Sequence, residues 1–167
     1  MYAVGRHDRV VELADLPQSC VGAPSPVIIG DEGTVSVAYR LSGPESVRLV
    51  QAREGVCIVQ FQGCRAQYAG SPNDEALHGH PLWKCGLEPY GAFEVMNSSW
   101  IRELARRNRV HPRHREEHFD ALRHIVLTFH DSLFECIAAG YDVHHLPGAI
   151  SRAIPEIVTR QFDLRFA

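Results

Sequence analysis

Lysine, paired cysteines and long apolar runs are what this sequence has least of. Lys84 is the only lysine among 17 basic residues, an excess of arginine that we interpret as codon bias in a GC-rich bacterial genome. The five cysteines are odd in number and form no Cys-x-x-Cys pair, so they indicate neither a zinc ribbon nor a disulfide framework. No stretch approaches the roughly 18 apolar residues of a membrane span, and the first residues carry charges where a signal peptide would be apolar. We therefore expect a cytoplasmic protein with reduced thiols.

The remaining composition is that of a globular protein. With 167 residues, 45% of them apolar and 22% charged, the chain is long enough for one domain with its own core. A formal net charge of -3 gives no general attraction to nucleic acid or to membranes. We find no internal repeat and no linker. The sequence predicts a single α+β domain over residues 1–167, with a mainly antiparallel β-sheet and two or three helices packed on it.

Strand patterns dominate the first two thirds of the chain. Residues 34–41 alternate between apolar and polar side chains, which is typical of a half-buried strand. The Gly-Asp-Glu-Gly turn before them joins this strand to a short apolar stretch as a hairpin. The predicted strands cover residues 26–29, 34–41, 46–51, 55–63 and 91–97. The fourth begins apolar on both faces and is therefore expected at the centre of the sheet.

Three segments carry helical patterns. A run of Asn and Ser residues caps a helix over residues 97–108. Pro112 suits the first turn of a short helix over 112–122, and Pro155 must lie in the first turn of a third helix over 148–162 or kink it. The segment from 68 to 90 is irregular and long for a loop in a small domain, and long ordered loops are disproportionately functional.

Residues 124–138 combine an apolar stretch with ionisable side chains. The apolar positions change phase in the middle of the stretch, and a tight turn at Asp131 and Ser132 restores a single apolar face. The resulting hairpin pairs Phe129 with Phe134. Further from the turn, it pairs Leu127 with Cys136 and Ile125 with Ala138.

The other face of this hairpin mixes His, Thr and Glu with aliphatic residues, as ligand clefts do. The predicted pairing places Glu135 opposite Thr128 and diagonal to His130. We therefore predict that His130 is a general base oriented by Glu135, with Asp131 beside it. The candidate substrate-binding residues are Thr128, Glu94 and Trp100. The alternative is a hydrogen-bonded structural histidine, a solvated glutamate and an aspartate that serves the turn.

A His-x-His pair in the irregular segment is a candidate metal site. On an extended chain, His78 and His80 point to the same side. With a third histidine such as His130 and a nearby carboxylate, they could bind a divalent metal such as zinc, iron or manganese. The alternative is that both histidines cap turns in the loop.

Two further clusters lie between residues 102 and 118. The sequence His-Arg-Glu-Glu-His from His114 to His118 has the spacing of paired ligands on a helix, but the flanking arginines repel a cation, and we interpret it as a solvated helix face. An arginine-rich belt over residues 102–115 could hold a phosphate, a nucleotide or RNA. The alternative for this belt is a charged outer helix face or a contact within a homo-oligomer.

Three functions remain open on this evidence. The first, which we favour, is a small enzyme or small-molecule binder whose cleft is formed by the 124–138 hairpin and covered by the 68–90 segment. Its chemistry would be acid–base catalysis, with or without a metal. The second is an anion or nucleic-acid binding module that uses the arginine belt. The third is an accessory subunit without catalysis, which requires a large exposed apolar patch.

Overall fold

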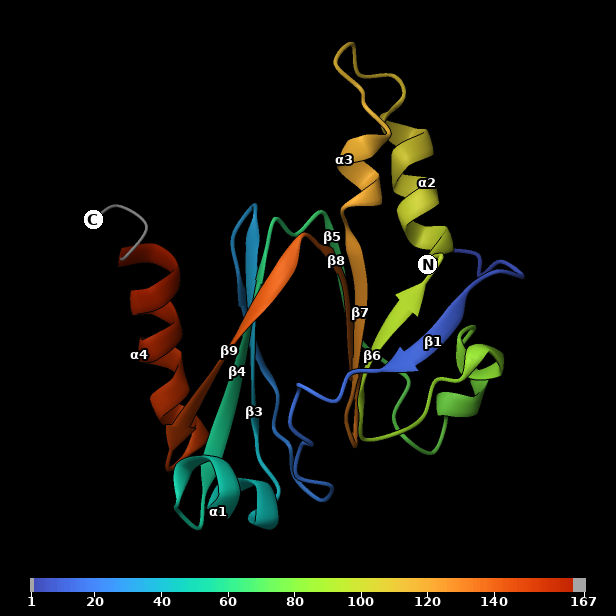
Figure 1. The fold of residues 1–167 in the computed structure, drawn as a ribbon. Helices are drawn as coiled ribbons and strands as arrows, with labels where there is room; N and C mark the ends of the chain where they lie inside the picture. The colour runs from blue at the N-terminus through green and yellow to red at the C-terminus, as the bar shows by residue number, and fades with distance from the viewer. Residues whose placement is uncertain (1, 164–167) are drawn as a thin grey trace.

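The strand-forming segments assemble into two antiparallel sheets that face each other (Figure 1). The computed structural model describes residues 2–163. The five-stranded sheet has the order β1 (Arg9–Glu12), β6 (Ala92–Met96), β7 (Arg123–Thr128), β8 (Leu133–Ala138) and β5 (Ala66–Gly70). The four-stranded sheet has the order β2 (Val27–Gly30), β3 (Thr34–Arg40), β4 (Gly55–Gln62) and β9 (Gly140–Pro147). The expected α+β class is therefore confirmed.

Helices lie around the sheets rather than between them (Figure 1). The four α-helices are α1 (Gly43–Val50), α2 (Ser99–Asn108), α3 (Glu117–Asp120) and α4 (Ala153–Val158). Three short 3₁₀ helices, η1 (Leu77–Gly79), η2 (Trp83–Cys85) and η3 (Ile150–Arg152), and a π-helical turn (Thr159–Asp163) complete the secondary structure. Within residues 2–163, none of the helices is long and apolar enough to cross a membrane.

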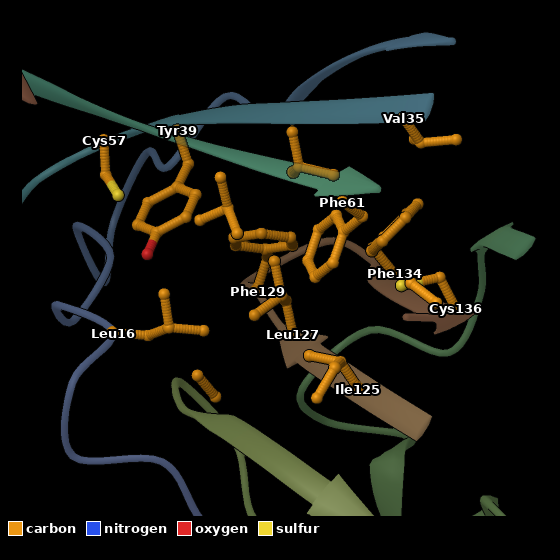
Figure 2. Close-up of a cluster of buried hydrophobic side chains, with 14 of the residues drawn as sticks. Leu16, Val35, Tyr39, Cys57, Phe61, Ile125, Leu127, Phe129, Phe134 and Cys136 are labelled. Carbon is orange, nitrogen blue, oxygen red and sulfur yellow. The ribbon is translucent and has the colours of Figure 1, made fainter. Parts of the chain in front are cut away.

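The main core fills the space between the sheets (Figure 2). Phe61 from the four-stranded sheet meets Phe134 from the five-stranded sheet, with ring centroids 5.5 Å apart. Tyr39 and Phe129 make a second contact of the same kind across the interface, also at 5.5 Å. Because every second residue of a strand points to the same face, each strand buries one set of side chains here and leaves the other set on the outer face.

Both outer faces are also covered. The helix α4 packs Ala153 and Ile157 on the four-stranded sheet. The segment with η1 and η2 places three leucines, Leu77, Leu82 and Leu87, on the outer face of the five-stranded sheet. Figure 1 shows this segment and α2 on the side of that sheet away from the sandwich core. The polar face that the sequence predicted for the 124–138 hairpin is therefore enclosed.

Several predicted elements are confirmed. The hairpin of β2 and β3 forms, β4 is central in its sheet, and α2 begins after its cap at Ser98. Pro155 lies in the first turn of α4. One predicted strand is wrong, because residues 46–51 belong mostly to α1. The Ser42 side chain accepts a hydrogen bond from the backbone N–H of Glu45, and Pro44 occupies the first turn, so this segment carries helix-start signals.

The helix predicted over 112–122 is shorter than its pattern indicates. Only Glu117–Asp120 is α-helical, so His114 precedes the helix and does not share a helical face with His118. Three strands, β1, β5 and β9, were not predicted from the sequence. Each is an edge strand of its sheet with many exposed or half-buried positions, which weakens the apolar alternation.

The hairpin of β7 and β8 forms, but its register differs from the prediction by two residues. Leu127 pairs with Phe134, and the connection runs from Phe129 to Ser132, where the Phe129 N–H donates to the Ser132 carbonyl at 2.9 Å. An even shift leaves each side chain on its predicted face. It changes the partner of Glu135, however, from Thr128 to Val126.

Removing a buried side chain from the space between the sheets should destabilise the whole fold. Leu127→Ala is expected to lower the free energy of unfolding by about 2–5 kcal/mol, because it opens a cavity in the main core. Val47→Ala on the exposed face of α1 is the matched control, with an expected change within about 0.5 kcal/mol. Urea denaturation followed by circular dichroism measures both. Equal values for the two variants would contradict this assignment of the core.

Candidate functional site

The centre of the outer face of the five-stranded sheet is a carboxylate. Glu135 lies in the middle of β8, opposite Val126 of β7 and opposite Tyr68 of β5. Its side chain points away from the sandwich core because its neighbours Phe134 and Cys136 point into that core. The residue is only 2% exposed. A carboxylate buried to this degree needs hydrogen-bond donors or positive charge around it.

Three side chains from distant parts of the chain surround the Glu135 carboxylate. His80 places its Nε2 atom 2.7 Å from Oε1, and His124 places its Nε2 atom 3.2 Å from Oε2. The Tyr2 hydroxyl donates to Oε2 at 2.9 Å. The His80 contact is close but outside hydrogen-bond geometry, so it acts as an electrostatic contact rather than a linear hydrogen bond. We name these four residues the Glu135 cluster.

The surroundings of Glu135 determine its charge. Burial acts to raise the pKa of this carboxyl, but the hydrogen bond from His124 and the close approach of both imidazoles outweigh burial and lower the pKa to about 2. Burial and the nearby Glu135 charge raise the pKa of the Tyr2 hydroxyl far above its ordinary value. At neutral pH the cluster therefore holds an ionised carboxylate beside a protonated phenol.

Backbone and capping contacts fix both imidazoles. The Nδ1 atom of His80 accepts a hydrogen bond from the backbone N–H of Leu82 at 3.2 Å, so the ring proton lies on Nε2, facing Glu135. The Nδ1 atom of His124 is 2.8 Å from the hydroxyl oxygen of Ser98, which also caps α2. Three of the four ring nitrogens therefore have a hydrogen-bond partner within the protein, and the fourth, His80 Nε2, has only its close contact with Glu135.

Aromatic stacking holds Tyr2 over the cluster. The ring of Tyr2 is parallel to that of Trp100, at 4.9 Å between centroids and 7° between planes. The rings of Tyr2 and Trp100 each make a T-shaped contact with the His124 ring, with centroid distances of 5.3 and 5.2 Å. Because Trp100 lies in the first turn of α2, the Ser98 cap and the aromatic stack position the helix and the N-terminal segment together.

A pocket of about 290 Å³ opens beside this cluster. Its lining combines a buried carboxylate, three aromatic rings, an amide and an ion pair. The lining residues are Tyr2, Gln67, Tyr68, Trp100, Glu103, Arg107 and Glu135. We name this the Glu135 pocket. Aromatic walls around a few placed polar groups are the usual composition of a small-molecule site.

The structure brings three of the sequence-predicted site residues to this pocket or its cluster. Glu135 and Trp100 line the pocket, and His80 contacts the Glu135 carboxylate but does not belong to the lining. His78 lies apart from them: it is exposed, and its Nδ1 atom is 3.1 Å from the backbone carbonyl of Glu75. The prediction that both histidines of the His-x-His pair point to the same side is wrong, because this segment is a 3₁₀ turn and not an extended strand.

His130 lies at the hairpin turn and has other partners than the one predicted. Its Nδ1 atom is 3.1 Å from a carboxylate oxygen of Asp74, and both groups contact the Tyr90 hydroxyl. The hydrogen bond that the Tyr90 hydroxyl donates to Asp74 lowers the pKa of the Asp74 carboxyl. The same bond raises the pKa of the Tyr90 hydroxyl to about 12. The predicted pairing of His130 with Glu135 is wrong because of the register shift. Asp131 is exposed in the turn, with a carboxylate oxygen 4.0 Å from His130.

The other two candidate substrate-binding residues have partners within the protein. The Thr128 hydroxyl donates to the backbone carbonyl of Glu88 at 2.9 Å and accepts from the N–H of Gly91 at 2.9 Å. Glu94 forms a two-point ion pair with Arg123, with distances of 3.1 and 2.6 Å. Neither residue lines the Glu135 pocket.

The expected metal centre has no counterpart in the described part of the chain. Within residues 2–163, no three His, Cys, Asp or Glu side chains are arranged so that they could hold a metal ion. The two histidines around Glu135 direct their Nε2 atoms at the carboxylate itself.

Sequence reasoning missed several contributors to the site, among them His124, Tyr68, Tyr2 and Ser98. The sequence placed His124 on the correct face of β7 but gave it no role. Once the register pairs Val126 with Glu135, His124 is the next residue along the same face and therefore lies near that carboxylate. Tyr68 was assigned to an irregular segment because β5 is short. Tyr2 and Ser98 carry no local signal for this role, since they reach Glu135 and His124 through tertiary contacts alone.

The charge of Glu135 should appear in the acid sensitivity of the fold. In the unfolded chain the pKa of a glutamate is about 4.3; in the native protein that of Glu135 is about 2. The depressed pKa contributes stability above pH 4.3, and this contribution is lost as the pH falls toward 2. At about 1.4 kcal/mol per pKa unit, it amounts to about 3 kcal/mol.

Glu135→Gln tests this linkage, because the amide has the same shape but does not titrate. The difference in unfolding free energy between wild type and Glu135→Gln is expected to be constant near neutral pH and to shrink between about pH 4.5 and 2. Denaturant titrations at a series of pH values measure it. Glu117→Gln, at an exposed carboxylate of α3, is the control. A difference that does not change with pH would contradict an ionised, hydrogen-bonded Glu135.

Comparison with known proteins adds no family to this geometry. No protein-family model matches the chain, and neither the curated proteins nor the solved structures contain a significant match. The functional argument therefore depends on the site itself.

Proposed function

We propose that the protein binds a small planar molecule with N–H donor groups in the Glu135 pocket. The observation that carries this proposal is a buried, ionised carboxylate at the base of an aromatic-walled pocket. The sequence favoured a small enzyme or a small-molecule binder, and this proposal takes the second of these two possibilities.

The charge of the pocket selects the donor groups. Glu135 and Glu103 are acidic, and Arg107 is the one basic residue in the lining. Arg107 is already paired with Glu103 at 2.7 Å, so Glu135 is the acidic residue of the lining without an arginine partner. A carboxylate has about four acceptor positions, and the hydrogen bonds from His124 and Tyr2 both go to Oε2. An amine, amidine or ring N–H of a ligand would complete the set.

The walls of the pocket select the planar shape. Trp100 and Tyr68 present aromatic surface, and 37% of Tyr68 is exposed. The Tyr2 ring stacks on Trp100 and completes an aromatic wall above the carboxylate. Flat rings stack well on such surfaces, and a positive charge on the ring adds a cation–π attraction of about 0.5–2 kcal/mol.

The same geometry supports binding better than acid–base catalysis. A general acid or base works best with a pKa near the working pH, whereas that of Glu135 is about 2. Both imidazoles of the cluster have their Nδ1 atoms engaged within the protein, and their Nε2 atoms lie 2.7 and 3.2 Å from Glu135. His130, oriented by Asp74, is the remaining candidate for acid–base chemistry, and it lies outside the lining of this pocket.

Benzamidine is a suitable first probe, because it is flat, cationic and rich in N–H donors. We expect saturable binding to the wild type by isothermal titration calorimetry and no binding of benzoate, which has the same ring with the opposite charge. Glu135→Gln is expected to weaken benzamidine binding at least about tenfold, since a hydrogen bond to a charged group contributes about 1.5–3 kcal/mol. The protein should carry no N-terminal tag, because Tyr2 is part of the site.

The two tryptophans provide a matched control for the position of the site. Trp100→Ala should weaken benzamidine binding, whereas Trp83→Ala should not, because Trp83 lies on the surface outside the pocket. Circular dichroism establishes that each variant is folded. Benzamidine binding that is absent from the wild type, or that persists unchanged in Glu135→Gln, would refute the proposal.

A further inference from the structure

A second pocket, of about 570 Å³, lies along α2 next to the Glu135 pocket. Its polar lining is basic or neutral, and no carboxylate belongs to it. Three arginines, Arg65, Arg107 and Arg113, line it together with two histidines and Asn108. The apolar part of the lining consists of Leu104, Phe119 and Leu122. We name this the arginine pocket.

Two of its arginines have no carboxylate partner. Within residues 2–163, no Asp or Glu oxygen lies within ion-pair distance of Arg65 or Arg113. Arg107 is paired with Glu103 at 2.7 Å. Arg109 of the same belt differs, because two of its nitrogens donate to one carboxylate oxygen of Glu116, at 3.1 and 2.7 Å. Positive charge is therefore left uncompensated at this pocket.

The apolar part of the lining makes this charge more effective than an equal charge on an open surface. Leu104 comes from α2, Phe119 from α3 and Leu122 from the segment before β7, and all three are half-buried. Low-dielectric walls beside charged groups focus the electrostatic field toward the opening. Guanidinium groups bind phosphate oxygens in pairs of parallel hydrogen bonds. The pocket therefore favours a phosphate or a similar oxyanion.

Arg107 belongs to both pockets. Trp100 and Glu103 line the Glu135 pocket, Leu104 and Asn108 line the arginine pocket, and Arg107 lines both. From Trp100 to Asn108 the helix rises by about 12 Å, at 1.5 Å per residue. The two pockets are also adjacent on the side formed by β5. Arg65 of the arginine pocket precedes Gln67 and Tyr68 of the Glu135 pocket by two and three positions. The acceptor site and the anion site thus adjoin along one helix.

We propose that the two pockets hold one ligand, with its N–H-bearing ring at Glu135 and its phosphate among Arg65, Arg107 and Arg113. The chemical class that fits is a phosphorylated heterocycle such as a nucleoside monophosphate. This inference rests on the proposed function and adds the second half of the ligand. A small molecule fits better than a nucleic-acid strand, because Arg102, Arg106 and Arg109 are engaged by acidic side chains and interrupt the belt.

The experiment compares the four ribonucleoside monophosphates with their matching nucleosides by calorimetry at low salt. At least one monophosphate is expected to bind about tenfold or more tightly than its nucleoside, and added salt should reduce this gain. The double variant Arg65→Ala and Arg113→Ala should remove the gain while leaving nucleoside binding unchanged. Arg115→Ala, at an exposed arginine of the same loop outside the pocket lining, should leave both unchanged.

The outcomes separate this inference from the proposed function. If no monophosphate binds more tightly than its nucleoside, or if the double variant keeps the gain, the shared-ligand inference is overturned. Benzamidine binding that depends on Glu135 would then still support the first pocket. Monophosphate binding that is lost in the double arginine variant but unaffected by Glu135→Gln would show a separate anion site and would also overturn the shared ligand.

Discussion

The burial of the Glu135 carboxylate is the constraint around which the outer face of the five-stranded sheet is organised. An ionised group in that position is tolerated only if donors surround it. The side chains around Glu135 come from three separate places: the N-terminal segment supplies Tyr2, the segment with η1 and η2 supplies His80, and β7 supplies His124. Removing any one of them leaves the charge less compensated, so the cluster couples segments that are far apart in the sequence.

This coupling explains where the pocket lies. The space between the two sheets is filled by large apolar side chains (Figure 2). The outer face is covered instead by helix α2 and irregular segments, and their junction above Glu135 leaves the pocket. The arginines of α2 and of the loop after it then set the charge of the neighbouring pocket. The sandwich thus supports a site made from strands β5 and β8, helix α2 and the N-terminal segment.

The sequence predicted the architecture better than the site, for physical reasons that particular residues illustrate. Alternation correctly placed Glu135 and His124 on a common outer face, since strand period depends on local pattern. The pairing partner of Glu135 was missed, because a turn of two or four residues satisfies the same alternation. The roles of Tyr2 and Ser98 depend on tertiary contacts, which no local pattern records. The His-x-His spacing misled because it assumed an extended chain, whereas the segment forms a 3₁₀ turn.

The measurement that tests this account most directly is the titration of the Glu135 carboxyl carbon by NMR. Protein labelled with ¹³C at the glutamate carboxyl groups, with the signal assigned by its absence in Glu135→Gln, would be followed from pH 7 to pH 3. The account predicts that the Glu135 signal keeps its ionised chemical shift over this range, because its pKa is about 2. A signal that titrates near the ordinary glutamate value of about 4.3, or above it, would contradict the Glu135 cluster and the site built on it.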